Sequence, residues 1–325
     1  MSSNLTTVAQ NPADNFAVSA IMAAIGIFGL LSNGAAMLSV WCNPILRNSF
    51  GVLCFSHSIA NFGVLLVFVF WLTPVTIMQA DITTELIGKI LGQINIMFWD
   101  VCVYSHLAIS INRIIAITLP YKAAELLTIR RTFLMVAIVW WLGFCHVIPY
   151  FWTNVCYIYY DTFHWVWIFA DTACGRVISM YTDCYTSLAV LFVICVLDSI
   201  TLIKLRMTNN VMNCQNADSI TSQAAQKKRR QTEARFFIQT LYQNGLFLYE
   251  LSNFYYITTL FTDQWAVFFT STFAWEVCHA FDGFVVVLFH FRLSFITNKG
   301  RATTVSSNRI FSTSIRTRQS KLPSS

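Results

Sequence analysis

Long apolar runs alternate with short polar segments along almost the whole chain. A helix needs about 20 mostly apolar residues to cross roughly 30 Å of hydrocarbon, and seven runs reach that length. The last two are the least apolar, because acidic residues and a histidine interrupt them. The pattern predicts an all-α membrane protein, a seven-transmembrane helix bundle. The expected spans are 16–41, 51–78, 88–119, 132–152, 181–205, 236–261 and 265–291.

Composition supports this interpretation. The chain is 56% hydrophobic and only 11% charged, whereas soluble domains carry about 25% charged residues. No basic n-region and cleavage site precede the first apolar run, so we expect no cleavable signal peptide. The expected division is an N-terminal segment at 1–15, a seven-helix domain at 16–291 and a tail at 292–325.

The distribution of basic residues predicts the orientation. With the N-terminus outside, 19 of the 21 Lys and Arg residues fall on inner segments, and only Lys89 and Arg176 lie outside. Because cytoplasmic loops of membrane proteins are enriched in Lys and Arg, we expect an extracellular N-terminus and a cytoplasmic C-terminus. Asn4 begins the only Asn-x-Ser/Thr sequon and would then be an outer glycosylation site.

Arg113 lies inside a long apolar stretch, 109–122. A cation at the bilayer centre costs about 2.5 to 3.5 kcal/mol and far less near an interface. Arg113 therefore marks the inner end of the third helix. It is either a stop-transfer residue that only fixes topology or a switch residue held in the bundle.

These features together resemble the plan of seven-helix G-protein-coupled receptors. Three motifs narrow the resemblance: 29–34 in helix 1, 43–51 in the first inner loop, and Trp99-Asp100 through to Asn112-Arg113 in helix 3. They look like those of the nematode serpentine receptor class X (Srx) chemoreceptors. The resemblance covers helices 1 to 4 well and weakens after helix 5.

The resemblance implies a chemosensory receptor without a cofactor. It would bind a small extracellular ligand, odorant or pheromone-like, and activate a heterotrimeric G protein from the plasma membrane, for example in the cilia of sensory neurons. Arrestin and a kinase would act on the Ser/Thr-rich tail. The basic cluster before helix 6 would serve as topological anchor, lipid phosphate contact and part of the G-protein surface. The coupling residues implied are Asn112, Arg113, Lys227, Lys228, Arg229 and Arg230.

Departures from the broader receptor pattern change the expected mechanics. Asn112 replaces the usual acidic residue before the arginine. We therefore predict that no adjacent ion pair holds Arg113 in the resting state and that basal activity is measurable. Asn61 stands where the helix 2 acid is usual, and the helix 7 motif survives only as the poor match 280–284.

Only two of the 10 cysteines lie in the expected outer loops. Cys156 and Cys174 both belong to the second outer loop, where an oxidising compartment permits a disulfide. We predict a bridge between them that holds the loop over the outer cavity. Cys184, near the top of helix 5, is the competing partner.

Helical angle predicts which residues of helix 3 face inward. At about 100° per residue, Asn95, Trp99, Cys102 and His106 form one stripe with Arg113. The upper members would line an outward-opening cavity. Alternatively, Trp99 and Cys102 only pack in the core and Asn95 only bonds a neighbouring helix.

Asp100 points away from this stripe and needs a partner, because an unpaired ionisable group at that depth is costly. Counting about 1.5 Å per residue, Asp100 lies about 20 Å above Arg113, and His146 lies about 22 Å above Arg131. The matched depths predict an Asp100–His146 pair between helices 3 and 4.

Helix 7 carries Glu276, His279 and Asp282 at three-residue spacing, which spreads them over one sector of the helix. No second His or Cys stands beside them at ligand spacing, so we expect no metal site. The ligand-pocket candidates are Asn95, Trp99, Cys102, Glu276 and His279. The expected structural polar residues are Asn33, Asn61, Asp100, His146 and Asp282.

No enzyme motif is present: the sequence has no nucleophile elbow, Gly-rich phosphate loop or His-Glu-x-x-His helix. We expect no enzyme activity and no nucleic-acid partner. The alternative is a channel or transporter subunit of insect-chemoreceptor type, whose N-terminus would lie inside, against the distribution of basic residues. An intramembrane enzyme is a weaker alternative.

Overall fold

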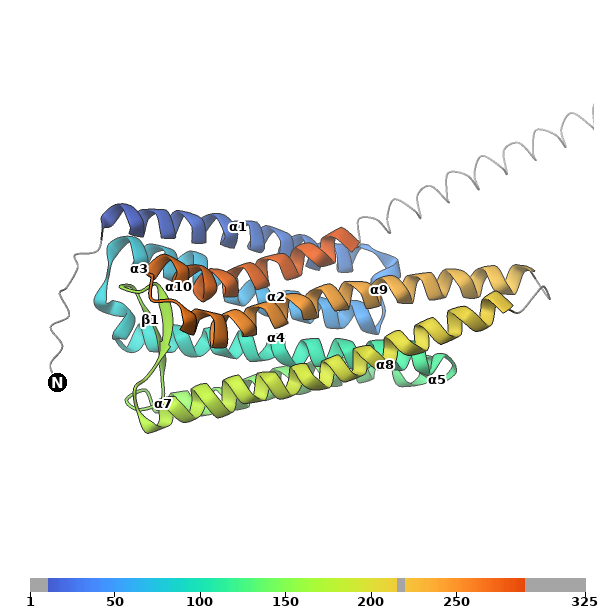
Figure 1. Cartoon of the computed structure of the whole chain (residues 1–325). Helices are drawn as coiled ribbons and strands as arrows, with labels where there is room; N and C mark the ends of the chain where they lie inside the picture. The colour runs from blue at the N-terminus through green and yellow to red at the C-terminus, as the bar shows by residue number, and fades with distance from the viewer. Residues whose placement is uncertain (1–10, 215–219, 290–325) are drawn as a thin grey trace, which may run out of the picture.

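A bundle of long, roughly parallel helices forms the molecule, with a small hairpin across one end (Figure 1). The computed structural model describes residues 11–214 and 220–289, with side chains described except at 45, 81 and 208–229. We call the two ends of the bundle the hairpin end and the Arg113 end. At the Arg113 end, α8 and α9 project beyond the other helices (Figure 1).

The first four spans are long helices with short irregular connections. Span 2 is one continuous helix that includes a π-helical turn, and the short α5 follows span 3. The bounds are α1 (Pro12–Cys42) for span 1; α2 (Ser49–Val67), π-helical Phe68–Leu72 and α3 (Thr73–Met78) for span 2; α4 (Leu86–Thr118) for span 3; α5 (Pro120–Leu126); and α6 (Ile129–His146) for span 4.

Spans 5 and 6 also contain π-helical turns, both at the hairpin end. Short 3-10 turns occur at Pro44–Leu46, Asp81–Thr84, Ile148–Phe151 and Thr258–Leu260. The bounds are α7 (Ala173–Val177), π-helical Ile178–Tyr185 and α8 (Thr186–Cys214) for span 5; α9 (Ile220–Ser252) and π-helical Asn253–Ile257 for span 6; and α10 (Gln264–Thr270) with helical residues 272–289 for span 7.

Six of the helices in the described residues are long and apolar enough to cross a membrane. The exception is α9, whose 33 residues are long enough but whose buried face is polar. That face carries Gln239, Gln243, Asn244 and Glu250. Large apolar side chains point outward elsewhere, for example Leu31 and Phe192, each 70% exposed. An apolar exterior around a polar interior is the arrangement expected of a multi-pass membrane protein.

Two boundaries differ from the sequence prediction. Span 4 was expected to reach 152, but α6 ends at His146 and a 3-10 turn follows. Pro149 explains the early end, because proline lacks a backbone N–H and disfavours helix in the residue before it. Span 6 begins at Ile220 rather than near 236, because the polar segment before the apolar run continues the same helix.

The loop between spans 4 and 5 contains a β-hairpin that the sequence analysis did not predict. Strands β1 (Ile158–Asp161) and β2 (Val166–Phe169) pair antiparallel, with Ile158 opposite Phe169. Both strands are rich in aromatic and β-branched residues, which favour strands.

Spans 1 and 7 pack closely through the 29–34 motif. A Cβ at Gly29 would lie 3.0 Å from the Ala280 Cα, so only glycine permits this approach. Ser32 Oγ donates to the Ala280 carbonyl at 2.8 Å, and Asn33 Nδ2 donates to the His279 carbonyl at 3.0 Å. The motif therefore fixes span 7 against span 1, and Asn33 is one of the buried polar residues that join the two spans.

Candidate functional site

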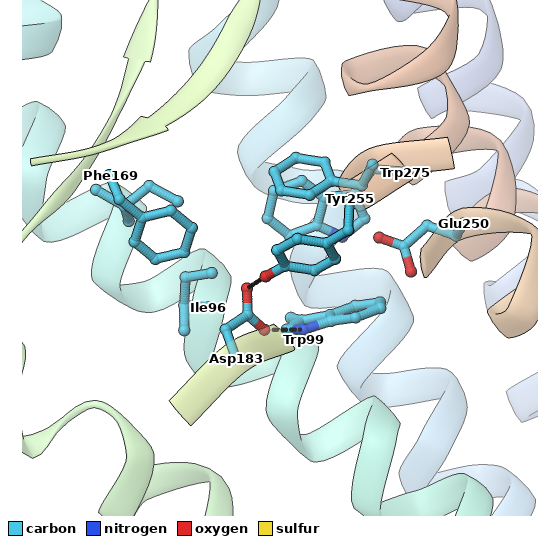
Figure 2. A pocket seen from close by; sticks show the side chains of 9 residues that line it. Ile96, Trp99, Phe169, Asp183, Glu250, Tyr255 and Trp275 are labelled. Atoms are coloured by element: carbon cyan, nitrogen blue, oxygen red, sulfur yellow. Dashed lines mark hydrogen bonds between the residues drawn. The ribbon is translucent and has the colours of Figure 1, made fainter. Parts of the chain in front are cut away.

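A small pocket lies between the helices beneath the hairpin (Figure 2). Spans 3, 5, 6 and 7 and both strands contribute to it. We call it the hairpin pocket. Its lining residues are Ile96, Trp99, Ile158, Phe169, Asp183, Glu250, Phe254, Tyr255 and Trp275.

π-Helical turns position three of these side chains. Asp183 lies in the π-helical segment of span 5, and Phe254 and Tyr255 lie in that of span 6. A π-helical turn holds more residues than an α-helical turn, so it shifts the direction of the side chains that follow, and such turns are frequent at functional sites.

The hairpin forms the roof of the pocket. Ile158 and Phe169, which face each other across the two strands, both line it. The hairpin is anchored through the buried Trp165, whose Nε1 donates to Asn15 Oδ1 at 2.8 Å and whose carbonyl accepts from Thr272 Oγ1 at 2.6 Å. It thereby contacts spans 1 and 7 as well as the pocket.

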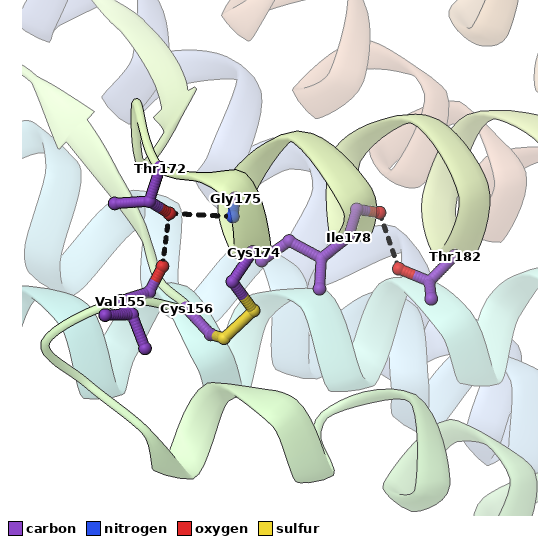
Figure 3. Close-up of a disulfide and its surroundings, with 7 residues drawn as sticks. All are labelled: Val155, Cys156, Thr172, Cys174, Gly175, Ile178 and Thr182. Atoms are coloured by element: carbon purple, nitrogen blue, oxygen red, sulfur yellow. Dashed lines mark hydrogen bonds between the residues drawn. A yellow bond between two sulfur atoms is a disulfide. The ribbon is translucent and has the colours of Figure 1, made fainter.

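A disulfide joins Cys156, just before β1, to Cys174 in α7 (Figure 3). Their Cα atoms are 5.3 Å apart. The predicted bridge is confirmed, and the competing partner Cys184 is a free, buried thiol. Thr172 reinforces the link, because its Oγ1 donates to the Val155 carbonyl at 2.5 Å. The disulfide thus ties the hairpin to the start of span 5.

Two carboxyl groups face the pocket in different environments (Figure 2). Asp183 accepts hydrogen bonds from Trp99 Nε1 at 2.9 Å and from the Tyr255 hydroxyl. Glu250 is only 3% exposed, and its Oε2 has no hydrogen-bond partner in the described structure. Burial without a partner is costly for a carboxylate. The pocket is therefore acidic, and one of its carboxylate oxygens has no hydrogen-bond partner in the described structure.

A polar core lies below the pocket and connects to it. Trp275 Nε1 donates to His279 Nε2 at 2.9 Å, and His279 Nδ1 lies 2.6 Å from Asn61 Oδ1. Asn61 Nδ2 in turn donates to Asp282 Oδ2 at 3.0 Å, and Asp282 also bonds His57. Asn61 and Asp282 thus belong to a buried hydrogen-bonded network in the interior.

Three side chains of this core could hold a metal ion. The ligand atoms of His57, His106 and Asp282 lie within 4.8 Å of one another, and all three residues are buried. The sequence offered no second His or Cys at ligand spacing beside the helix 7 residues, but two histidines approach Asp282 from spans 2 and 3. The expectation that no metal binds stays a prediction.

Of the five predicted ligand-pocket residues, only Trp99 lines the hairpin pocket. Cys102 and His279 lie in the polar core, where Cys102 Sγ is 3.3 Å from Asn61 Oδ1. Asn95 is buried, and neither of its side-chain polar atoms has a partner among the described residues. Glu276 is buried against span 1, where a Cβ at Gly26 would lie 2.8 Å from its Oε1.

Asp183 was not predicted to line a pocket, and Glu250 was counted only among the acidic residues that interrupt span 6. The available signal was an acidic residue within or beside an apolar run, which is costly unless it faces protein or water. The aromatic lining residues gave no such signal, because aromatic residues are common throughout this chain.

The predicted contact between Asp100 and His146 is present. Asp100 Oδ1 and His146 Nδ1 are 3.3 Å apart, joining spans 3 and 4. Tyr104, one turn below Asp100, places its hydroxyl 2.7 Å from His146 Nε2. The matched depths therefore predicted the right partner, whereas the contact of Tyr104 with His146 was not predicted.

A second cavity lies at the Arg113 end. Spans 2, 3 and 6 and α5 surround it. We call it the Arg113 cavity. Its lining residues are Asn48, Ser49, Phe50, Asn112, Arg113, Ala116, Ala123, Ala124, Leu127, Glu233 and Phe236.

Arg113 is paired, contrary to prediction. Its Nη1 donates to Glu233 Oε2 of α9 at 2.7 Å, and its Nη2 bonds Asn112 Oδ1. The guanidinium also lies 4.1 Å from the ring centroid of Phe50. The error arose because only the neighbouring position was considered, whereas the carboxylate comes from another helix.

Asn112 connects the arginine to neighbouring helices. Its Nδ2 donates to Ser49 Oγ of α2 at 2.5 Å, and Thr132 Oγ1 of α6 donates to the same oxygen at 2.7 Å.

Arg230 lies on α9 one turn before Glu233. The side chains of Lys227, Lys228 and Arg229, and Asn4 and the tail, lie outside the described residues.

Comparisons with known proteins agree with this architecture. A family model described as "Serpentine type 7TM GPCR chemoreceptor Srx" matches residues 24–290. Serpentine receptor class X 45 of Caenorhabditis elegans is 26% identical over 262 residues, covering 76% of this chain and 71% of that protein. The crystal structure of squid rhodopsin superposes with a TM-score of 0.68 at 16% identity, covering 86% of this chain and 78% of that one, and shows the shared seven-helix fold. The chain therefore belongs to the Srx family of serpentine seven-transmembrane G-protein-coupled chemoreceptors.

Proposed function

We propose that this receptor binds a small extracellular ligand in the hairpin pocket and activates a heterotrimeric G protein at the Arg113 end. The observation that carries the proposal is the ion pair between Arg113 and Glu233, beside a cavity at the end opposite the hairpin pocket. An ion pair between two helices is an element that a partner can break, which is what a switch requires.

The hairpin end faces the outside in this proposal, with the N-terminus extracellular and the C-terminus cytoplasmic. The Cys156–Cys174 disulfide supports this orientation, because disulfides persist in oxidising compartments. The distribution of basic residues supports it independently. Epitope tags at both ends test it: only the N-terminal tag is expected to stain on intact cells, and staining of the C-terminal tag would overturn the orientation.

Contacts between the pocket and the polar core suggest how binding reaches the Arg113 end. Trp99 and Trp275 line the pocket, and Trp275 bonds His279 in the core. On the far side of the core, His106 Nδ1 lies 3.1 Å from Asn244 Oδ1 of α9, the helix that carries Glu233. A ligand that moves Trp275 therefore acts on residues packed against span 6.

The remaining assignments extend the same proposal. The receptor acts at the plasma membrane, including sensory cilia, and contacts lipid phosphates through the basic cluster at 227–230. The tail at 292–325 accepts phosphates from a kinase and then binds arrestin.

A cell assay tests the function. Receptor-expressing cells are exposed to an odorant panel, with calcium and cyclic nucleotide as readouts. We expect at least one odorant to give a response that intracellular GDPβS abolishes, and that cells with the Arg113→Ala receptor lack at equal surface level. An odorant-evoked current that persists with GDPβS would instead indicate the channel alternative and contradict G-protein coupling.

A further inference from the structure

We propose that the ligand of the hairpin pocket is a small organic cation, a protonated amine whose ammonium group lies between Asp183 and Glu250. This inference rests on the proposed receptor function, because it names the ligand class of the same site.

The first reason for this inference is the charge of the pocket. Asp183 and Glu250 come from spans 5 and 6 and both line the pocket, whereas none of the nine lining residues is basic. Two nearby carboxyl groups cannot both ionise cheaply in a buried site unless a cation accompanies them. An ammonium group supplies both the missing positive charge and the hydrogen-bond donors.

The second reason is the Glu250 carboxylate oxygen that forms no hydrogen bond to a described residue. Glu250 is almost fully buried and points toward the aromatic rings of the pocket (Figure 2), and no described residue bonds its Oε2. Asp183, by contrast, is held in place by Trp99 and Tyr255. The pocket therefore has one fixed acceptor and one unused acceptor. A neutral hydrocarbon ligand would leave Glu250 unsatisfied, and an anionic ligand would add to the repulsion.

The third reason is the set of aromatic rings that line the pocket. Trp99 and Trp275 meet edge to face with ring centroids 5.9 Å apart, and Phe254 lies 6.0 Å from Trp275 and 5.1 Å from Tyr255. Faces of aromatic rings attract cations, and desolvation strengthens the attraction. Carboxylates combined with aromatic walls form a site suited to an ammonium group with a short apolar tail.

The dimensions limit the ligand. The lining rings and the two strands leave little free space between them. A large ligand would have to displace the rings or the hairpin. We therefore expect small amines to bind best.

The test uses purified full-length receptor in lipid nanodiscs and measures thermal stability. The probes are two matched sets with the same carbon skeletons: butylamine, butan-1-ol and butyrate, and 2-phenylethylamine, 2-phenylethanol and phenylacetate. A ligand that binds only the folded state raises the Tm with concentration. We expect at least one amine to raise it, at a concentration at least tenfold lower than its alcohol, and the carboxylates to have no effect. Equal stabilisation by amine and alcohol, or none by either amine, would overturn the inference.

Variants localise the effect. Glu250→Gln and Asp183→Asn keep the shape of each side chain and are expected to weaken amine binding at least tenfold. Glu85→Gln, an exposed acid at the same end, is the matched control and should bind amines as the wild type does. Full amine binding by both pocket variants would refute the site. If either variant fails to fold, the amine and alcohol comparison on the wild type decides.

This measurement needs no G protein, so the two proposals can fail separately. Failure of the amines to bind, together with an odorant response in cells, removes the ligand class and leaves the receptor function. Amine binding without G-protein activation would support the ligand class and contradict the proposed receptor function.

Discussion

Arg113 of α4 and Glu233 of α9 form an ion pair, with Nη1 and Oε2 2.7 Å apart, beside the Arg113 cavity. The arginine side chain is 3% exposed and the glutamate side chain 24%. The pair joins span 3 to span 6. Because it lies at the rim of the bundle, a protein that enters the cavity can compete for Arg113.

Breaking this pair from the glutamate side should raise basal signalling. Glu233→Gln removes the charge and leaves the arginine free to turn toward the cavity. For a partly exposed pair we expect a shift of about 1 kcal/mol, or about fivefold in the ratio of active to resting receptor. The measurement is basal cyclic nucleotide or calcium signal per receptor at the cell surface. Glu125→Gln, an exposed acid on α5 at the same end, is the control, and an equal effect in that variant would sink the prediction.

The Asp100–His146 contact should contribute measurable coupling between spans 3 and 4. Asp100→Asn and His146→Leu each remove one partner from a buried pair, whose side chains are 4% and 17% exposed. We expect a coupling energy of about 1 kcal/mol in a double-mutant cycle. The cycle is measured by thermal unfolding of the purified receptor, with surface expression as a second readout. Additive effects in both would show that the two residues do not interact.

Removing the disulfide should release the roof of the hairpin pocket. The bridge closes a loop with a sequence separation of 18, which the chain-entropy model values at about 3 kcal/mol. The Cys156→Ser/Cys174→Ser double variant should unfold at lower temperature and respond to odorants weakly or not at all. Cys195→Ser, an exposed free cysteine, should change neither property. Mass mapping of non-reduced peptides checks the bond itself, and finding both thiols free in surface-expressed protein would refute it.

The fold was accessible from the sequence because its signals are local. Apolar runs of sufficient length predicted the spans, and matched depth along two helices predicted that Asp100 meets His146. The two loop cysteines predicted the disulfide because no other cysteine lies in an expected outer loop. The first two inferences need only helical rise and the cost of burying polar groups, and the third needs only the side of the membrane on which the cysteines lie.

The site was less accessible because it depends on contacts between distant segments. Glu233 meets Arg113 across a sequence separation of 120, and no local pattern near Arg113 indicates that partner. His57 and His106 approach Asp282 from two other helices in the same way. The hairpin was missed because its strands have four residues each and lie in a loop between spans, where the search was for helices.

The most direct test of the account is nucleotide exchange by purified receptor in lipid vesicles with purified heterotrimeric G proteins of each class. The Glu233→Gln receptor makes the test independent of any ligand. We predict that it accelerates GTPγS binding by at least one class above the wild-type rate, and that adding Arg113→Ala returns the rate to that of empty vesicles at the same amount of folded receptor. An unchanged rate in the double variant, or no acceleration of any G protein by Glu233→Gln, would contradict the claim that Arg113 is the switch through which this receptor activates a G protein.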